Sequence, residues 1–222
     1  MKTVSSASER LRLYYREQPF LLAPMAGVTD AAYRIMCRRH GAKMAFSEMV
    51  SVAGLAYKSE KTWDLVLPAA EEPQICVQLF GSKPEQFASA VEAVEERVGE
   101  KLSSIDINMA CPARKVVTKG EGSALMRDPE LAAQIAAAAV GRAHVPVTCK
   151  MRIGYAAGEC VAPDFAARLE QAGISGVAVH GRFATQLYTG DADWSIIDDV
   201  ASRIDIPRSE EHTSELQSPI DI

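Results

Sequence analysis

The sequence predicts an α/β fold, and within that class an incomplete (β/α)8 TIM barrel with about six βα units. Short apolar stretches alternate along the 222 residues with segments of helical periodicity, which is the pattern of a parallel sheet buried on both faces. Polar residues stand at the C-terminal ends of successive stretches, where barrel enzymes hold their ligands. No GxGxxG motif follows a predicted strand, which disfavours a dinucleotide-binding sheet.

The predicted strands and helices follow one another over residues 19–207, which we expect to form the partial barrel domain. Its strands are expected at residues 20–23, 44–47, 75–79, 104–108, 147–151 and 176–180. Its helices are expected at residues 31–39, 52–58, 84–98, 129–140, 164–171 and 196–201. Asp30 is a typical N-cap, and Pro84 occupies the first turn of an amphipathic helix. Residues 1–18 are charged with interspersed Leu and Tyr, and we expect a lead-in that lies across the bottom of the domain.

The end of the chain departs from the repeating pattern. A seventh strand should begin at residues 204–207, but residues 208–222 are polar and lack a strand pattern, and Pro207 would enter a central strand. Residues 208–218 resemble an in-frame translation of a common sequencing-library adapter. We therefore expect residues 208–222 to be a non-native, disordered tail that adds no paired strand, and two barrel strands to be missing.

Composition narrows the functional classes. The N-terminus lacks the apolar core of a signal peptide, and no apolar run approaches the ~20 residues that span a bilayer, so the default expectation is a cytoplasmic protein without a membrane contact. The five cysteines form no CxxC pair, which argues against a disulfide framework and against a metal site. Much of the net charge of −5 lies in residues 208–222, so local basic clusters are more informative about nucleic acid. Two such clusters are Arg38, Arg39 and Lys43, and Arg114, Lys115 and Lys119.

Residues 105–122 are the most informative stretch. They begin as an alternating strand and break at Cys111 and Pro112 into a basic, glycine-containing loop, so a thiol stands at a strand end. Asn108, three residues earlier, is near enough to face the same ligand. Cys111 could be a nucleophile with a base such as His180, a general acid with an ordinary pKa of ~8.5, or an inert thiol. Spacing alone leaves these alternatives open.

Other strand ends carry further candidates. Residues 24–27 (Pro-Met-Ala-Gly) form a tight turn, and their small side chains would also let a flat ring approach the backbone. Gln78 is an amide in an apolar strand and needs a partner, because an unpaired buried amide costs ~1–3 kcal/mol. Lys150 ends a strand that should be buried, which favours an anionic ligand over a structural ion pair. His180 occupies the equivalent place one strand later and is followed by Arg182, although a lone histidine is more often structural.

With these residues in place, the chain resembles the tRNA-dihydrouridine synthase family from about residue 20 to residue 207. The motifs that carry the resemblance are Ala-Pro-Met-Ala-Gly-Val-Thr-Asp (23–30), Ser-Glu-Met-Val (47–50), Gln-Leu-Phe-Gly (78–81), Asp-Ile-Asn-Met-Ala-Cys-Pro (106–112), Lys-Gly-Glu-Gly-Ser-Ala-Leu-Met (119–126), Lys-Met-Arg-Ile-Gly (150–154) and Val-His-Gly-Arg (179–182). Each motif alone is weak, but their common order and spacing are specific.

The resemblance implies an FMN-dependent, NADPH-dependent oxidoreductase that acts on a CH–CH bond, the reduction of uridine to 5,6-dihydrouridine in tRNA. It implies that hydride passes from reduced FMN to C6 of the uracil and that Cys111 protonates C5. By the same correspondence, the FMN contacts would be Pro24, Met25, Ala26, Gln78, Lys150 and His180. Asn108 would help to hold the uracil, and Arg182 would be a further substrate contact. The expected partners are tRNA and NADPH, and we expect a monomer.

The chain also departs from the family pattern. Ala110 stands where the family usually has Gly, which matters only if this residue needs a positive φ. Phe183 and Ala184 replace a common Thr-Arg pair, so an RNA contact there is in doubt. The loops after strands seven and eight, which hold the flavin phosphate, and the small helical RNA-binding domain are expected to be absent from this C-terminally truncated chain.

Two other functions compete with this interpretation. One is another FMN barrel oxidoreductase, such as a dihydroorotate or dihydropyrimidine dehydrogenase, which also acts on a C5–C6 bond. The combined cysteine and Lys-Gly-Glu-Gly motifs argue against it. The other is a catalytically inactive RNA-binding fragment, against which the set of Cys111, Gln78 and Lys150 argues.

Overall fold

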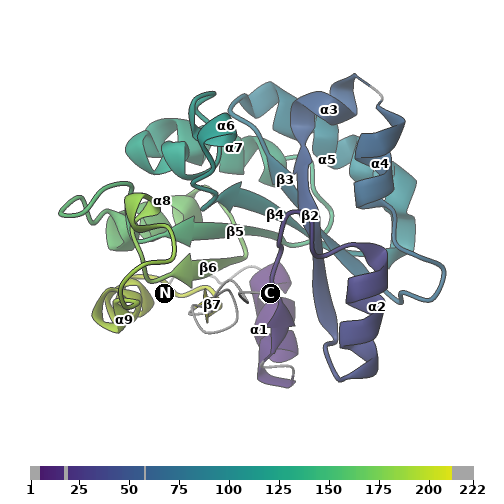
Figure 1. Cartoon of the computed structure of the whole chain (residues 1–222), viewed down its shortest axis with the longest axis horizontal. Coiled ribbons are helices and arrows are strands. Elements are labelled where there is room, and N and C mark those ends of the chain that lie inside the picture. The colour runs from purple at the N-terminus through teal and green to yellow at the C-terminus, as the bar shows by residue number, and fades with distance from the viewer. Residues whose placement is uncertain (1–5, 18–19, 58, 212–222) are drawn as a thin grey trace, which may run out of the picture.

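The computed structural model describes residues 6–17, 20–57 and 59–211. Seven parallel strands form one sheet in the order of the sequence, and the sheet curls with helices on its outside (Figure 1). The strands are β1 (Leu21–Leu22), β2 (Met44–Ser51), β3 (Ile75–Phe80), β4 (Leu102–Met109), β5 (Val147–Arg152), β6 (Gly176–His180) and β7 (Arg208–Glu211). In the part of the chain that is described, β1 and β7 pair only with β2 and β6, so the sheet is an open, incomplete (β/α)8 barrel.

The helices lie between successive strands in the chain, except for α1, which precedes β1. They are α1 (Ser6–Glu17), α2 (Ala31–Arg39), α3 (Val52–Ala56), α4 (Glu60–Val66), α5 (Pro84–Val98), α6 (Arg114–Val117), α7 (Pro129–Val140), α8 (Ala162–Gln171) and α9 (Trp194–Arg203), with short 3-10 turns η1 (Gly99–Lys101), η2 (Gly122–Arg127) and η3 (Ala184–Gln186). Helices α2, α5 and α7 have the predicted bounds, because strong local signals mark them. Asp30 caps α2 by accepting a 2.8 Å hydrogen bond from the Tyr33 amide, and Pro84 and Pro129 open α5 and α7.

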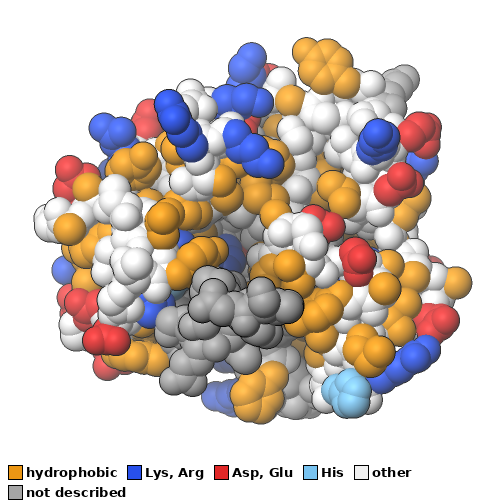
Figure 2. Space-filling view, in the orientation of Figure 1, with side chains coloured by type: hydrophobic (Ala, Val, Ile, Leu, Met, Phe, Trp, Pro, Cys, Tyr) orange, Lys and Arg blue, Asp and Glu red, His pale blue; other side chains and the backbone are white. Residues whose placement is uncertain are grey.

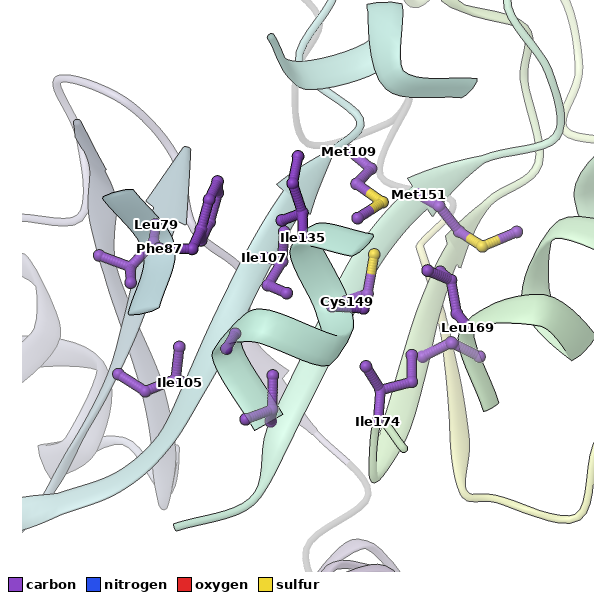
Figure 3. Close-up of a cluster of buried hydrophobic side chains, with 14 of the residues drawn as sticks. Leu79, Phe87, Ile105, Ile107, Met109, Ile135, Cys149, Met151, Leu169 and Ile174 are labelled. Carbon is purple, nitrogen blue, oxygen red and sulfur yellow. The ribbon is translucent and has the colours of Figure 1, made fainter. Parts of the chain in front are cut away.

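The two faces of the central strands differ in chemistry. Along β4, Ile105, Ile107 and Met109 alternate with Asp106 and Asn108, and all five side chains are buried. The apolar set packs outward against the helices, together with the apolar residues of β3 and β5 (Figure 3). The polar set faces the inside of the curl. Both faces are therefore buried as predicted, but only the outer one is purely apolar.

Helix α1 lies at the N-terminal ends of the strands. Tyr14 and Tyr15 pack against Met44 and Phe46 at the start of β2. Leu11 is buried, and its side chain lies 3.2 Å from where a Cβ would stand at Gly176, the first residue of β6. This helix therefore covers the end of the sheet opposite the strand ends that carry the predicted site.

The expectation that residues 208–222 add no paired strand is wrong for residues 208–211. These form β7, in parallel register with β6 from Val177↔Arg208 to His180↔Glu211. The physical reason is that strand pairing uses backbone N–H and C=O groups, which the free edge of β6 offers to any side-chain sequence. Arg208 and Glu210 remain exposed, so their side chains add nothing to the core. Residues 212–222 lie outside the described residues.

None of the helices in the described ranges is both long and apolar enough to cross a membrane.

Candidate active site

A cleft of about 500 Å³ opens at the C-terminal ends of the strands. Eight of the nine predicted site residues line it, namely Pro24, Met25, Ala26, Gln78, Asn108, Cys111, Lys150 and His180. The fold thus brings together residues from the loop after β1 and from β3, β4, β5 and β6. Further lining residues that the sequence did not single out include Tyr33, Met49, Arg152 and Tyr188.

The Cys111 thiol stands on the loop that follows β4 and is partly exposed. The backbone of Cys111 is fixed on both sides: its amide donates to Asn108 Oδ1 at 2.9 Å, and its carbonyl accepts from the Ser123 amide at 3.0 Å. Ala110 also donates its amide to Asn108 Oδ1, at 3.2 Å, and it does not adopt a positive φ. Alanine at this position therefore causes no backbone strain, and Asn108 shapes the turn that presents the thiol.

Gly122 packs closely against the backbone of Cys111. Its φ is +60°, and a Cβ there would lie 2.7 Å from the Cys111 carbonyl oxygen. Gly120 has a φ of +74° but open space around it, so it is a matched control. We expect Gly120→Ala to lower the free energy of unfolding by about 1–2 kcal/mol through backbone strain alone. Gly122→Ala should lower the free energy of unfolding by about 1–3 kcal/mol more, because its Cβ would also collide with the Cys111 carbonyl oxygen.

Urea unfolding of the two glycine variants measures this difference. Alkylation of Cys111 by iodoacetamide, followed by peptide mass spectrometry, should also change rate in Gly122→Ala and not in Gly120→Ala. Equal losses of stability and equal alkylation rates would show that Gly122 does not support the thiol.

Below the cleft, buried polar side chains form a continuous hydrogen-bonded relay across three strands. Asn108 Nδ2 donates to Gln78 Oε1 at 2.8 Å, and Gln78 Nε2 donates to Asp106 Oδ2 at 2.7 Å. Thr148 Oγ1 donates to the other oxygen of Asp106 at 2.6 Å. Strand register creates the relay, because Gln78 pairs with Asp106 and Asp106 with Thr148 across neighbouring strands. Gln78 therefore has the partner that its burial requires.

Asp106 is the charged member of this relay and is almost fully buried. Burial raises its pKa to about 6, against the lowering effect of the hydrogen bonds from Gln78 and Thr148 and of the Lys150 charge. Cys76 on β3, Cys149 on β5 and Tyr15 on α1 also interact electrostatically with Asp106, and burial raises the pKa of each of these side chains. A buried carboxylate whose pKa is raised in this way is typical of functional sites.

The raised pKa of Asp106 predicts a specific pH dependence. Because the folded chain holds this proton more tightly than the unfolded chain, whose pKa is near 3.8, stability falls as pH rises from about 4 to about 6. Relative to Asp106→Asn, the wild-type chain should lose about 2 kcal/mol of unfolding free energy between pH 4 and pH 7. Urea unfolding of both proteins across this range measures the difference, and a constant difference would contradict the raised pKa.

Two arginines, Arg152 and Arg182, hold the loop after β6. Arg152 donates to the carbonyl oxygens of Phe183 and Leu187 at 3.0 and 2.8 Å, and to that of Ala110 at 3.0 Å. It thereby ties this loop to the turn before Cys111. Arg152 was not among the predicted site residues, although its place two residues after Lys150 on β5 puts it on the same inner face.

Arg182, in contrast, does not line the cleft. It is buried and donates to the Gly190 carbonyl at 2.8 and 3.1 Å and to His180 Nε2 at 3.2 Å. Because a guanidinium only donates hydrogen bonds, neutral His180 carries its proton on Nδ1. The Nε2 atom of His180 is therefore occupied and is not a base for Cys111.

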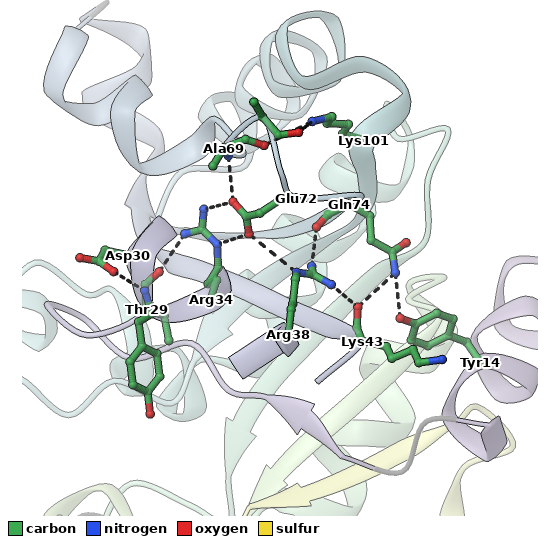
Figure 4. Close-up of polar contacts among 12 residues, drawn as sticks. Tyr14, Thr29, Asp30, Arg34, Arg38, Lys43, Ala69, Glu72, Gln74 and Lys101 are labelled. Carbon is green, nitrogen blue, oxygen red and sulfur yellow. Dashed lines mark hydrogen bonds and ion pairs between the residues drawn. The ribbon is translucent and has the colours of Figure 1, made fainter. Parts of the chain in front are cut away.

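The turn after β1 is anchored by a buried ion pair (Figure 4). Arg34 binds both carboxylate oxygens of Glu72 at 2.7 Å and donates to the Thr29 carbonyl at 2.8 Å. Thr29 in turn exchanges hydrogen bonds with the backbone of Met25. Burial by itself would raise the pKa of Glu72, but the hydrogen bonds from Arg34 and from the Ala69 amide outweigh it and lower that pKa. This network holds Met25 in the wall of the cleft.

A comparison with known protein families agrees with a functional site at this position. The model of the family described as Dihydrouridine synthase (Dus) matches residues 21–209, which is most of the chain. This chain belongs to the dihydrouridine synthase family. The matched range includes every lining residue of the cleft, and it ends at the second residue of β7.

Curated relatives agree with the family assignment. A tRNA-dihydrouridine synthase B from Xanthomonas axonopodis pv. citri is 42% identical over 84% of this chain and 55% of that protein. One from Pseudomonas aeruginosa is 41% identical over 89% of this chain and 59% of that protein. A probable tRNA-dihydrouridine synthase from Rickettsia bellii is 42% identical over 84% and 57%. The chain thus spans a little over half the length of these relatives.

A solved nitroalkane oxidase from Streptomyces ansochromogenes is 15% identical with a TM-score of 0.45 over 87% of this chain and 58% of that one, which is too slight a likeness to support an argument.

The two basic clusters of this dihydrouridine synthase chain lie at opposite ends of the sheet. Arg114, Lys115 and Lys119 are exposed on and just after α6, beside Cys111. Figure 2 shows Lys and Arg side chains gathered over this region, next to a hollow in the surface. Arg38 binds the carbonyl oxygens of Lys43 and Gln74, near the starts of β2 and β3. Only the first cluster therefore borders the cleft.

Proposed function

We propose that this chain is the catalytic barrel of an enzyme that reduces uridine to 5,6-dihydrouridine in tRNA, with FMN as cofactor and NADPH as reductant. The observation that carries the proposal is the position of Cys111. Its backbone is held by two hydrogen bonds, and its side chain lines a cleft that opens at the strand ends. Family membership gives the reaction class, and the cleft supplies a place for it.

The lining of the cleft fits a flat flavin ring. Pro24, Met25 and Ala26 offer a small, largely apolar wall, which Thr29 and the Arg34–Glu72 pair keep in place. Gln78 has one N–H beyond the one it gives to Asp106, and Lys150 and His180 complete the polar side. The acceptor atoms along one edge of the ring suit these donors. Reduced FMN, when bound there, would supply hydride to C6 of the uracil.

Cys111 would supply the proton to C5. A thiol placed beside the reacting carbon can act as a general acid by giving up its S–H proton. The competing role of nucleophile would need a base, and Nε2 of His180 is already bonded to Arg182. These two points favour the acid.

The substrate would reach the cleft as a base turned out of an RNA strand. Arg114, Lys115 and Lys119 stand beside Cys111, where they would meet the phosphates that flank the flipped nucleotide. Asn108 would donate to the uracil from the floor of the cleft. Arg182 would act on substrate only through His180 and the loop it holds, since it is buried behind them.

The direct test uses tRNA from a strain that lacks dihydrouridine. The full-length protein should copurify with a flavin that absorbs visible light, NADPH should reduce that flavin, and mass spectrometry should then detect uridine gaining two hydrogens. Turnover of free dihydroorotate or dihydrouracil without any product in tRNA would favour a dehydrogenase instead. Binding of tRNA without flavin would favour an RNA-binding module.

A further inference from the structure

Two buried amides, those of Gln78 and Asn108, lie between a carboxylate and a pair of backbone N–H groups. At one end, Gln78 Nε2 lies 2.7 Å from Asp106 Oδ2. At the other, Asn108 Oδ1 lies 2.9 Å from the Cys111 nitrogen and 3.2 Å from the Ala110 nitrogen. A carboxylate only accepts hydrogen bonds, and a backbone N–H only donates one. Each end of the relay therefore dictates the orientation of the amide next to it.

The two ends of the relay require compatible orientations of the two amides. The carboxylate of Asp106 requires the NH2 group of Gln78, which leaves Gln78 Oε1 pointing to Asn108. The backbone N–H groups require the oxygen of Asn108, which leaves its NH2 group pointing to Gln78 Oε1 at 2.8 Å. Turning either amide alone would bring like groups together in the interior, where each unpaired group is strongly unfavourable.

This arrangement of the two amides determines which hydrogen-bonding groups the floor of the cleft presents to a ligand. Asn108 Oδ1 accepts two hydrogen bonds and is saturated, whereas Asn108 Nδ2 keeps one N–H. Gln78 Nε2 likewise keeps one N–H, while its oxygen is bonded to Asn108. Within the described residues, both amides line the cleft and Asp106 does not.

We propose that Asp106 is the positioning residue that sets this polarity, so that Gln78 and Asn108 present N–H donors to the cleft and select ring edges that carry acceptors. Carbonyl oxygens and unprotonated ring nitrogens qualify, and an N–H edge is rejected. The ligand identity rests on the proposed function, whereas the relay rests on the contacts alone. Thr148, which donates to Asp106 from β5, completes the support.

An exchange of two residues tests the relay, because it reverses the two hydrogen bonds that Gln78 makes with residues 106 and 108. Asn108→Asp alone places a carboxylate oxygen against Gln78 Oε1, with Asp106 blocking the turn of that amide. Adding Asp106→Asn lets Gln78 turn: residue 106 then donates to Gln78, and Gln78 donates to residue 108, which still accepts from Cys111. Urea unfolding of wild type, both single variants and the double variant gives the coupling between the two sites.

We expect the double variant to recover at least tenfold in the folding equilibrium constant over the additive expectation, which is about 1.4 kcal/mol. If Asn108→Asp does not fold at all, a folded double variant is the same rescue. Additive losses, or an unfolded double variant beside a folded Asn108→Asp, would overturn the relay.

An activity assay separates the direction of the hydrogen bonds in the relay from their contribution to stability. In the full-length protein, the double variant should reduce tRNA uridine at least 100-fold less efficiently in kcat/KM despite its recovered stability, because residue 108 no longer donates. Asp106→Asn alone keeps an acceptor toward Gln78, so its kcat/KM should fall far less than that of the double variant. Activity of the double variant at the wild-type level would overturn the donor requirement. Failure of the wild-type protein on tRNA would overturn the proposed function and leave the unfolding result to decide the relay.

Discussion

Replacement of Cys111 by alanine is expected to abolish dihydrouridine formation while NADPH still reduces the bound flavin. A positioned general acid contributes about 10²–10⁴-fold to rate, and the thiol is the only group in our proposal that supplies the C5 proton. The alanine side chain leaves both backbone hydrogen bonds of residue 111 intact, so the turn should keep its shape. Single-turnover assays that follow flavin absorbance and tRNA product separately measure the two steps.

Cys160 provides the matched control for this substitution. It is exposed and does not line the cleft. Cys160→Ala should therefore leave both flavin reduction and product formation close to wild type. Equal product formation by Cys111→Ala and Cys160→Ala would rule out the proposed proton donor.

Loss of the Glu72 carboxylate is expected to have the largest effect on stability. Both members of the Arg34–Glu72 pair are almost fully buried, at 3% and 0% side-chain exposure, so Glu72→Gln leaves the Arg34 charge uncompensated in the interior. Breaking such a pair costs about 3–5 kcal/mol. Because Arg34 also binds the Thr29 carbonyl, the wall formed by Met25 should loosen and FMN should bind more weakly.

The neighbouring residue supplies the comparison. Glu71 pairs with Arg39 at 3.3 Å on the surface, where both side chains are about two-thirds exposed. Glu71→Gln should change the free energy of unfolding by no more than about 1 kcal/mol. Urea unfolding and FMN titration of the two variants measure the contrast, and similar losses in both would show that burial of the pair does not matter.

Helices with strong local signals could be predicted from the sequence alone. Proline at the first turn and apolar residues at helical spacing located α5, and the Asp30 cap located α2. Helix α4 was missed because only Trp63 and Val66 of its seven residues are buried, too few to show a period. Strand β7 was missed because its pairing depends on the free edge of β6 and not on its own side chains.

The same distinction applies to the site. Residues at the ends of strands could be proposed as a group because the C-terminal ends of parallel strands meet at one edge. Arg182 also follows a strand, yet its guanidinium turns inward because the Gly190 carbonyl lies within reach only after the loop has folded back. Asp106 stands in the most conspicuous motif, but its role becomes visible only with the partners on β3 and β5.

The sequence by itself determined the order of the βα units and the placement of Cys111, Lys150 and His180 at strand ends, since both follow from local periodicity and from where it breaks. The tertiary structure decided the strand register. Register sets Gln78 opposite Asp106, and Asn108 opposite Lys150. Those pairings join segments far apart in the chain, and no local pattern encodes them. They fix which way the buried amides point, and with that the chemistry that the cleft can offer.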